Sequence, residues 1–389
     1  MRIVHIITRL IVGGAQENTL LTCEGLSRDY GDDVVLITGP GLGPEGSLVE
    51  QARCRQVSTI VLPDLRRAIH PLRDWRSYRA IVSVLNDLGP EVVHTHSAKA
   101  GLLGRCAASK LGVPAIVHTV HGAPFHAYQG RGARALFRHC EWYAAIRCHA
   151  LVSVADAMTD QLVAAGVAPR EKFVTIHSGM EVGPFLNADD CRAEVRKKLG
   201  YSDEHVVIGT VARLFHLKGH DDLIDVARRV VDRQPKARFL WVGGGRLQRT
   251  LQARIERVGL APFIQITGLV PPTRIPEMIG AMDLVVHASL REGLARVLPQ
   301  ALIAGRPVVC YDIDGAREVV IHGETGYLIE PRQIEPMADA ICELASSEPL
   351  RRRLAEEGRR RFTDRFRHET MTRRLRELYT RLLGSKLER

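Results

Sequence analysis

The sequence predicts an α/β fold with two doubly wound parallel sheets, because short β-branched segments alternate with longer helical segments along all 389 residues. This length suits two domains of roughly 180 residues each. The hydrophobic content of 45% is enough for two cores, and the aromatic content of 5% favours aliphatic strands over stacked-base binding. The expected strands span 3–8, 34–38, 59–62, 92–95, 115–119, 150–154 and 173–176 in the first half, and 206–211, 238–242, 264–267, 284–288, 308–311 and 327–329 in the second.

The boundary between the two domains is expected near residue 180, where a glycine after a strand and then Pro184 interrupt regular structure. We therefore predict one domain over 1–180, a second over 181–365 and a separate basic helix over 366–389. Paired domains of this kind usually bind their ligand in the cleft between them, outside the carboxyl ends of the strands.

The formal net charge of +10 is concentrated at the C-terminal end, where residues 351–389 hold 13 arginines and one lysine against six acids. Such a segment could contact an anionic membrane or nucleic acid. The alternative is a solvated amphipathic helix, since Met371, Leu375, Leu378 and Leu382 recur at helical spacing. No nucleic-acid motif accompanies the charge, so nucleic acid is not expected as a partner.

Other features indicate a cytoplasmic protein. No apolar segment approaches the ~18 residues of a membrane-spanning helix, and the first residues enter a strand without a cleavage site, so we expect no signal peptide. The eight cysteines are scattered without a Cys-x-x-Cys pair, which is typical of small buried side chains in a reducing compartment.

The segment 289–300, with the sequence SLREGLARVLPQ, predicts a tight turn between a strand and a helix. The turn carries Glu292 and ends in backbone N–H groups at the helix start. A ligand with hydroxyl and phosphate groups would suit these donors and acceptors. The alternative is a helix start without a ligand.

Three further segments follow strands and could contact a phosphorylated ligand. Arg213 and Lys218 are five residues apart before Gly219, and could hold a diphosphate from two sides; the alternative is a pair of exposed basic side chains. Glycines at 13–14 and 243–245 would allow a backbone to approach a ligand closely, although each set could also be a plain turn. Neither set has the G-x-G-x-x-G spacing of a dinucleotide site.

Histidines are the remaining polar feature at predicted strand ends. His94 and His96 alternate on one strand, and His118 and His121 follow on the next. A His-x-His pair can chelate a metal ion. No acidic or cysteine partner lies nearby in the sequence, so we do not expect a metal there.

Taken together, the R-x4-K-G segment at 213–219, the turn at 289–300, the glycine loop at 13–14 and the His121-Gly122 pair resemble the family 4 glycosyltransferases. The resemblance covers nearly the whole chain and implies the GT-B fold, in which two Rossmann-like domains face a deep cleft. It implies that the basic C-terminal helix packs back on the N-terminal domain. One position departs from the family, because Gln300 stands where a second glutamate usually binds the ribose.

The resemblance also implies the site. Its catalytic residues would be His121, Arg213, Lys218 and Glu292, with the two cations neutralising the diphosphate and Glu292 binding the donor sugar. The other donor-binding positions would be Gly14, Gly243, Gly293, Leu294, Ala295 and Gln300. The acceptor side would include Gln16, His96 and Lys99.

The implied reaction is sugar transfer from a nucleotide diphosphate with retention of anomeric configuration, without a metal or cofactor. The acceptor would be a glycan or a lipid-linked glycan in polysaccharide synthesis, with the basic tail on the inner face of an anionic membrane. Asp312 and Asp314 form an Asp-x-Asp pair, which binds metal in the other large glycosyltransferase fold, but a loop without metal is expected here. A sugar-nucleotide epimerase of the same fold and a non-catalytic sugar-nucleotide binder remain alternatives.

Overall fold

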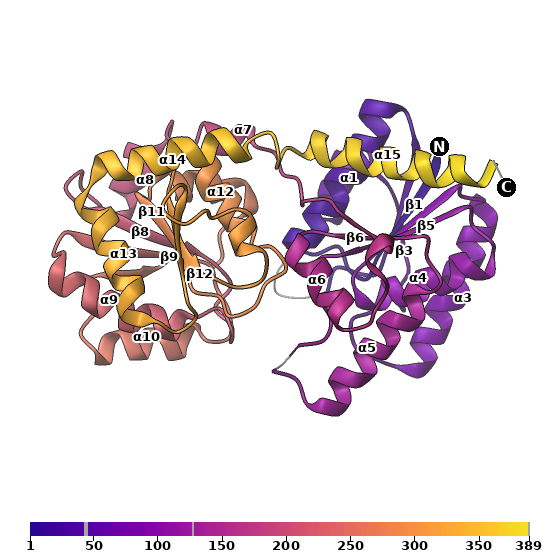
Figure 1. Cartoon of the computed structure of the whole chain (residues 1–389), viewed down its shortest axis with the longest axis horizontal. Helices are drawn as coiled ribbons and strands as arrows, with labels where there is room; N and C mark the ends of the chain where they lie inside the picture. The colour runs from indigo at the N-terminus through magenta and orange to yellow at the C-terminus, as the bar shows by residue number, and fades with distance from the viewer. Residues whose placement is uncertain (43–45, 127, 388–389) are drawn as a thin grey trace. The chain divides into compact units, whose positions relative to one another are not determined.

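The structure is a computed structural model that describes residues 1–42, 46–126 and 128–387. It divides into two compact units, each described here by itself. The first contains Met1–Met180 together with Phe366–Arg389, and the second contains Glu181–Arg365. Each unit is a parallel sheet with helices on both faces, so the predicted α/β fold with two doubly wound domains is confirmed (Figure 1).

The first unit has a seven-stranded sheet in the order β3-β2-β1-β4-β5-β6-β7, and every neighbouring pair is parallel. Its strands are β1 Arg2–Ile7, β2 Asp33–Thr38, β3 Ser58–Val61, β4 Val92–His96, β5 Ala115–Val120, β6 Ala150–Ser153 and β7 Phe173–Thr175. The central strands are buried on both faces, as expected for a sheet covered by helices on each side.

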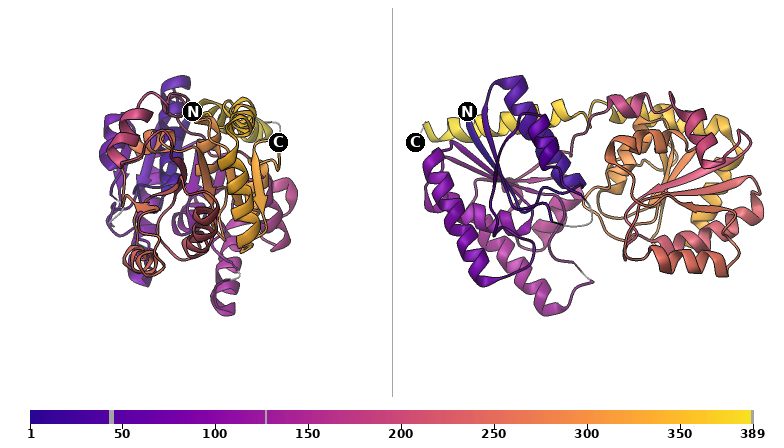
Figure 2. Two further views of the ribbon diagram at one scale, coloured as in Figure 1. Left: turned by 90° about the vertical axis from the view of Figure 1, so that its left-hand side faces the viewer. Right: turned by 180° about the vertical axis from the view of Figure 1, so that it is seen from behind.

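The helices of this unit separate onto the two faces of the sheet because each parallel crossover is right-handed. α1 and α15 pack together on one face, and α3, α4 and α5 follow one another on the other (Figures 1 and 2). The helices are α1 Gly14–Tyr30, α2 Val49–Cys54, α3 Pro71–Leu88, α4 Ala98–Lys110, α5 Arg131–Ala145, α6 Asp156–Ala164, the 3-10 turn η1 Arg170–Lys172, and α15 His368–Leu387.

The second unit has a six-stranded parallel sheet in the order β10-β9-β8-β11-β12-β13. Its strands are β8 Val206–Val211, β9 Ala237–Val242, β10 Ile264–Ile266, β11 Leu284–His287, β12 Val308–Tyr311 and β13 Gly326–Ile329. Its helices are α7 Gly183–Leu186, α8 Arg192–Leu199, α9 His220–Arg233, α10 Gln248–Arg257, η2 Pro272–Arg274, α11 Ile275–Gly280, α12 Val297–Ile303, η3 Asp314–Glu318, α13 Ile334–Ser346 and α14 Glu348–Phe362.

The C-terminal helix α15 completes the core of the first unit. Met371, Leu375, Leu378 and Tyr379 are all buried against α1 and the sheet. The chain enters the helix beside Gly179, where an added Cβ would lie 2.6 Å from the Cα of His368. The helix is therefore amphipathic, which is one of the two interpretations of the basic segment, and its apolar side is part of the core of the first unit.

All thirteen expected strands are present, and each end falls within one residue of its prediction. Within the described ranges, no helix has both the length and the apolar character needed to cross a membrane.

Candidate functional site

The carboxyl edge of the second sheet holds a cluster of charged and polar side chains. Glu292 lies in the loop after β11, and its Oε1 accepts hydrogen bonds from Lys218 Nζ and from His287 Nε2, the latter at 3.2 Å. His287 is the last residue of β11, and Lys218 comes from the loop after β8. Two neighbouring strands thus bring one anion and two nitrogen donors together.

Backbone contacts hold the two loops against each other. Leu290 donates its backbone N–H to the carbonyl of Leu217 at 2.8 Å, and Ser289 Oγ donates to the same oxygen at 3.0 Å. Gly219 adopts φ 71°, and a Cβ there would lie 1.9 Å from the carbonyl oxygen of Ala288. A side chain at position 219 would separate the loops, so the R-x4-K-G segment needs its glycine.

The electrostatics of the cluster keep Glu292 ionised. Burial by itself would raise its pKa, but the hydrogen bond from His287 and the charge of Lys218 lower the pKa well below its ordinary value. The nearby His220, the first residue of α9, is neutral instead of charged. Burial, with a smaller contribution from His287 and Lys218, lowers the pKa of His220 to about 4, so it is neutral near pH 7.

The loop after β12 supports the backbone at Glu292. Asp314 Oδ2 accepts the backbone N–H of Glu292 at 2.7 Å, and burial raises the pKa of Asp314. Asp312 is engaged separately, in an ion pair with Arg317. The two carboxylates of the Asp-x-Asp pair therefore have different partners, which supports the interpretation of this segment as a structural loop.

The rest of the 289–300 segment has the predicted form. Gly293, Leu294 and Ala295 lie in the loop that leads into α12, where Gly293 accepts a long hydrogen bond from the backbone of Gly315 at 3.4 Å. Gln300 is a half-buried residue in the first turns of α12. The turn and the helix are confirmed, while ligand binding by these positions stays a prediction.

Arg213 lies in the loop after β8, and the triple glycine follows β9 and contacts this loop. Arg213 is exposed, with its guanidinium 5.1 Å from the ring centroid of Phe215. A Cβ added to Gly243 would lie 2.1 Å from the carbonyl oxygen of Ala212, and a Cβ added to Gly245 would lie 2.4 Å from the carbonyl oxygen of Leu214. These glycines accommodate the protein's own backbone, which supports the plain-turn alternative, and contact of Gly243 with a nucleotide stays a prediction.

The carboxyl edge of the first sheet holds neutral histidines. His5 Nδ1 lies 3.0 Å from His96 Nε2, and His96 Nδ1 lies 3.1 Å from His121 Nε2. The three imidazoles form a hydrogen-bonded chain from the sheet interior to the loop after β5. Burial lowers the pKa of His5 to about 3 and that of His96 well below its ordinary value, so both rings are neutral.

The direction of this chain follows from its buried end. His5 Nε2 is buried and has no hydrogen-bond partner among the residues that the structure describes. An unpaired buried N–H is rarer than an unpaired acceptor, which favours a hydrogen on Nδ1 of His5. His5 then donates to His96 and His96 donates to His121. This assignment places the remaining hydrogen of His121 on Nδ1.

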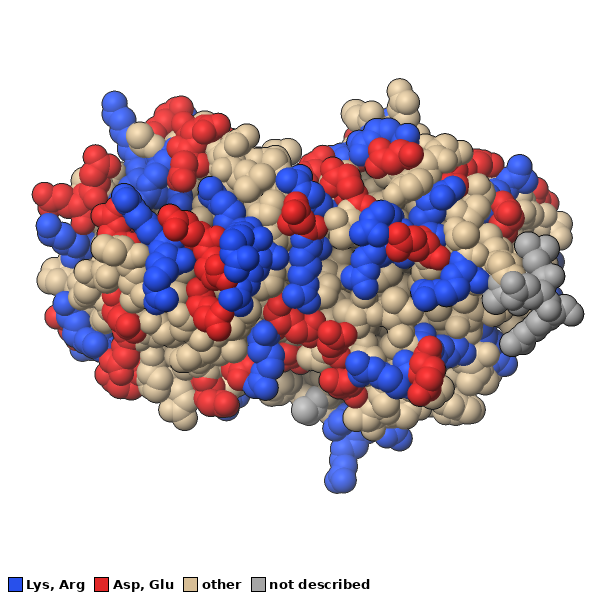
Figure 3. All heavy atoms as spheres, turned by 45° about the horizontal axis from the view of Figure 1, so that its top comes forward, with Lys and Arg blue, Asp and Glu red and all other residues tan. Residues whose placement is uncertain are grey.

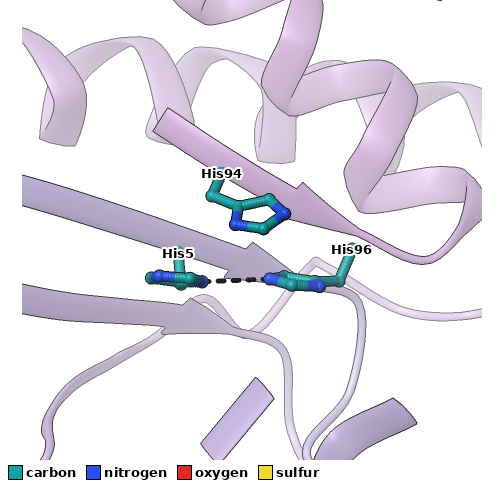
Figure 4. A group of neighbouring side chains, drawn as sticks. All are labelled: His5, His94 and His96. Carbon is teal, nitrogen blue, oxygen red and sulfur yellow. Dashed lines mark hydrogen bonds between the residues drawn. The ribbon is translucent and has the colours of Figure 1, made fainter. Parts of the chain in front are cut away.

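His94 joins the group from the side, and its geometry bears on metal binding. Its ring stacks on His96 with centroids 4.4 Å apart at 30°, whereas the rings of His5 and His96 are 14° apart with centroids at 5.3 Å and are joined by their hydrogen bond (Figure 4). One His94 nitrogen contacts Tyr379 Oη at 2.5 Å and the other contacts Thr119 Oγ1 at 2.7 Å. One nitrogen from each of His5, His94 and His96 lies within 4.8 Å of the other two, but both nitrogens of His94 already have hydrogen-bond partners. A hydrogen-bonded cluster therefore fits better than a chelating site.

The remaining predicted positions of the first unit lie near this edge. Gly13 and Gly14 form the start of α1, and an added Cβ at Gly13 would lie 2.8 Å from Gln16 Oε1. Lys99 Nζ donates to Asp74 Oδ1 at 2.5 Å and to the carbonyl of Ala68, which ties α4 to α3. These contacts give Lys99 a structural role, and its place on the acceptor side stays a prediction.

His118 points to the opposite face of the sheet from His94 and His96. Its Nδ1 contacts Thr95 Oγ1 at 2.9 Å, and its Cε1 would lie 2.5 Å from a Cβ on Gly101. His118 is therefore a buried group packed against α4.

Sequence reasoning missed His5, Tyr379 and His287. His5 is a single histidine in an apolar strand, and only the register that pairs it with His94 reveals its role. Tyr379 lies 285 residues from its partner, His94. His287 gave a usable signal, since it is the last but one residue of the strand predicted over 284–288 and precedes Glu292 by five residues.

Comparison with known proteins identifies the chain. The family described as Glycosyl transferase 4-like domain matches residues 13–179, and Glycosyl transferases group 1 matches residues 192–361. The chain belongs to the family 4 glycosyltransferases of the GT-B fold. It is therefore an enzyme, a glycosyltransferase, and each of the two family models matches within one of the two units.

Named relatives of this glycosyltransferase cover most of its length. It is 26% identical over 356 residues to the UDP-Gal:alpha-D-GlcNAc-diphosphoundecaprenol alpha-1,3-galactosyltransferase of Escherichia coli, with 90% of this chain and 89% of the relative covered. It is 23% identical over 330 residues to the capsular polysaccharide biosynthesis glycosyltransferase CapM of Staphylococcus aureus, with 83% and 85% covered. The crystal structure of Anabaena HepE in complex with UDP has a TM-score of 0.82 at 21% identity, covering 98% of this chain and all of the other, and supports the fold.

Proposed function

We propose that this glycosyltransferase moves a sugar from a nucleotide diphosphate donor to a lipid-linked glycan acceptor during cell-surface polysaccharide synthesis. The observation that carries the proposal is the cluster of Glu292, Lys218 and His287 at the carboxyl edge of the second sheet. A carboxylate that stays ionised can accept hydrogen bonds from sugar hydroxyls. The neighbouring cation and the start of α12 suit phosphate oxygens.

Donor binding would use the charges already present at this edge. Lys218 and Arg213 would neutralise the diphosphate, and each charge-assisted hydrogen bond to phosphate contributes about 1.5–3 kcal/mol. Glu292 would bind the sugar hydroxyls. The backbone at Gly293, Leu294 and Ala295 would contact the diphosphate, and Gly14 and Gly243 would border it.

The proposed chemistry retains the anomeric configuration. The bond between the anomeric carbon and the diphosphate oxygen breaks, a glycosidic bond forms to an acceptor hydroxyl on the same face, and the hydroxyl proton passes to the departing diphosphate. Arg213 and Lys218 would stabilise the charge that develops on the leaving group, so we propose that no metal is required. His121 would donate its Nδ1 hydrogen to the donor sugar, with its orientation set by His96.

The acceptor proposal rests on the named relatives. The Escherichia coli enzyme is named for a diphosphoundecaprenol acceptor and CapM for capsular polysaccharide synthesis. A lipid-linked acceptor would place the enzyme at the cytoplasmic face of the membrane as a peripheral protein. Gln16 and His96 would then border the acceptor.

A donor screen tests the proposal. The purified chain is incubated with UDP-, GDP- and dTDP-sugars, with and without an undecaprenyl-diphosphate-sugar acceptor, and release of nucleoside diphosphate is followed. We expect release with one donor class, dependent on acceptor, with an unchanged rate in EDTA and retention by proton NMR of the product. Free sugar without acceptor would indicate an epimerase, and binding without turnover would indicate a non-catalytic binder.

A further inference from the structure

Helix α5 presents an apolar face to solvent. Leu136, Trp142, Tyr143 and the adjoining Ile146 are exposed by 56%, 42%, 40% and 55%. At 100° per residue these four side chains fall on one side of the helix. A surface helix normally turns its apolar side to the core, so this arrangement calls for a partner.

Buried contacts fix α5 in this rotation. Glu141 is buried and accepts a hydrogen bond from Arg105 Nη2 of α4 at 2.9 Å, while Arg105 Nε donates to the Gly101 carbonyl at 2.8 Å. Ala144 and Ala145 fill the rest of the buried side. Rotating the helix to bury Trp142 would break a buried ion pair, which costs several kcal/mol.

Arginines flank the apolar face. At 100° per residue, the exposed Arg131 and Arg138 border one edge of this face and Arg147 borders the other, where its guanidinium lies 3.5 Å from the ring centroid of Tyr143. Glu141 is the only acid between residues 131 and 147, and its charge is turned inward. The exposed side of α5 therefore combines large apolar side chains with positive charge that no acid of the helix offsets.

An apolar hollow continues this surface beside the end of α5. It is lined by Trp142 and Ile146 from the helix and by Val163, Val167 and Lys172 from the following elements. Lys172 adds a further cation at its rim.

We propose that the outer side of α5 docks on an anionic lipid surface. Leucine, isoleucine and tryptophan would enter the boundary between headgroups and acyl chains, and the arginines would contact lipid phosphates. Tryptophan and tyrosine favour this depth in a bilayer. The proposal rests on the lipid-linked acceptor proposed above and names the surface that would bring the enzyme to it.

Charge favours lipid over a second copy of the chain. In a two-fold symmetric dimer the same surface faces itself, so the arginines of one α5 would meet those of the other without an exposed acid of that helix to pair with. The basic tail differs from α5 in its apolar part. Among the described side chains, none of the exposed large apolar residues lies on α14 or α15. Some of the tail arginines also have acidic partners, since Glu357 pairs with Arg360 and Glu377 with Arg373, and acids lie among the arginines on this surface (Figure 3).

Vesicle binding tests the proposal without donor or acceptor, so its outcome is independent of transfer. The chain is sedimented with vesicles of phosphatidylcholine alone or mixed equally with phosphatidylglycerol. We expect binding to the mixed vesicles only, and about tenfold weaker binding for Trp142→Ser with Ile146→Ser. Leu269→Ser, which removes an exposed leucine of the second unit, is the matched control and should bind like the parent.

A second pair of variants separates α5 from the tail. Arg131→Ser with Arg138→Ser should weaken binding severalfold at low salt, while Arg374→Ser with Arg381→Ser on α15 should leave it unchanged. In a Trp75→Phe background, brominated acyl chains should quench Trp142, since the third tryptophan, Trp241, is buried.

Three results would overturn the proposal. The first is parent-like binding by the Trp142 and Ile146 variant, and the second is loss of binding on changing the tail arginines instead. The third is a failure of the parent to bind anionic vesicles. A dimer that dissociates in the Trp142 and Ile146 variant would identify a second copy as the occupant.

Discussion

Each sheet ends in a cluster of titratable side chains, and the cluster of the first sheet is neutral whereas that of the second sheet is charged. At the edge of the first sheet, His5, His94 and His96 are neutral because desolvation lowers their pKa values and no carboxylate opposes it. At the edge of the second sheet, Glu292 is ionised although it is partly buried, because His287 and Lys218 stabilise its charge. Both edges occupy the position where ligands bind in open α/β sheets.

This difference indicates a division of chemistry between the two units. A charged cluster can stabilise the charge that develops on a leaving diphosphate, whereas neutral imidazoles can orient a hydrogen bond without repelling a cation or attracting an anion. The comparison predicts that charge-removing variants in the second unit affect turnover most. Variants in the histidine cluster should mainly affect stability and its pH dependence.

The largest effect is expected from Glu292→Ala. Removal of the carboxylate eliminates the acceptor for sugar hydroxyls and leaves Lys218 without its partner, so kcat should fall by roughly 10²–10³. Transfer is measured with the donor found in the screen. Glu204→Ala, which removes an exposed carboxylate paired with Lys236, is the control and should keep full activity. Retained turnover in Glu292→Ala with intact circular dichroism would exclude Glu292 from the site.

A smaller effect on binding is expected when both cations are removed. Arg213→Ala with Lys218→Ala should weaken nucleoside diphosphate affinity by about 100-fold, and the two single effects should not add because both side chains would hold the same diphosphate. Calorimetry with nucleoside diphosphate measures this. Arg229→Ala with Arg233→Ala, which removes two exposed arginines of α9, is the matched control. Unchanged affinity in the first double variant would refute the diphosphate role.

The histidine cluster should make the first unit sensitive to mild acid. The pKa of His5 is about 3 in the folded chain and 6.5 in its ordinary state, so the unfolded chain binds more protons between these values. Stability therefore falls as pH drops below about 6.5, and His5 alone accounts for about 2 kcal/mol between pH 7 and pH 5.

His5→Asn tests this dependence. Urea unfolding of the variant should be less steeply dependent on pH between 7 and 5 than that of the parent, whatever its absolute stability. His216→Asn, at an exposed position of the second unit, should leave the slope unchanged. An equal slope in His5→Asn would mean that His5 is not held neutral. Glu292 loses its contribution only as pH falls below its ordinary range, because its folded pKa is lowered.

Local sequence patterns predicted the strands because each strand is a short apolar segment bounded by turn residues. Such a segment is visible in a few consecutive residues. Local patterns also placed Glu292, Lys218 and Gly219 correctly at strand ends, where a turn residue and a charged side chain occur together. The pairing of His5 with His94 depended on strand register, and the contact of Tyr379 with His94 depended on where α15 packs. Neither is a local property of the chain.

Helix α5, whose apolar side faces solvent, is a second feature that local sequence patterns do not predict. Its apolar residues recur at helical spacing and would ordinarily predict a core face. Only the buried pair of Arg105 and Glu141, which joins residues 36 positions apart, shows that this face points outward. A buried charge can therefore reverse the orientation that an apolar pattern suggests.

The smallest expected effect concerns the departure from the family at Gln300. Gln300 lies half-buried in the first turns of α12, close in sequence to Glu292. If its carbonyl accepts from the ribose hydroxyls, Gln300→Glu should tighten nucleoside diphosphate binding by a few fold, because a charged acceptor forms the stronger hydrogen bond. Calorimetry with the ribose and 2′-deoxyribose forms of the nucleotide measures this, and the gain should appear only with ribose. Gln252→Glu, at a half-buried position of α10, controls for added negative charge. A large loss of affinity in Gln300→Glu would instead mean that the side chain faces phosphate, and the ribose contact would then have to come from another residue of this edge.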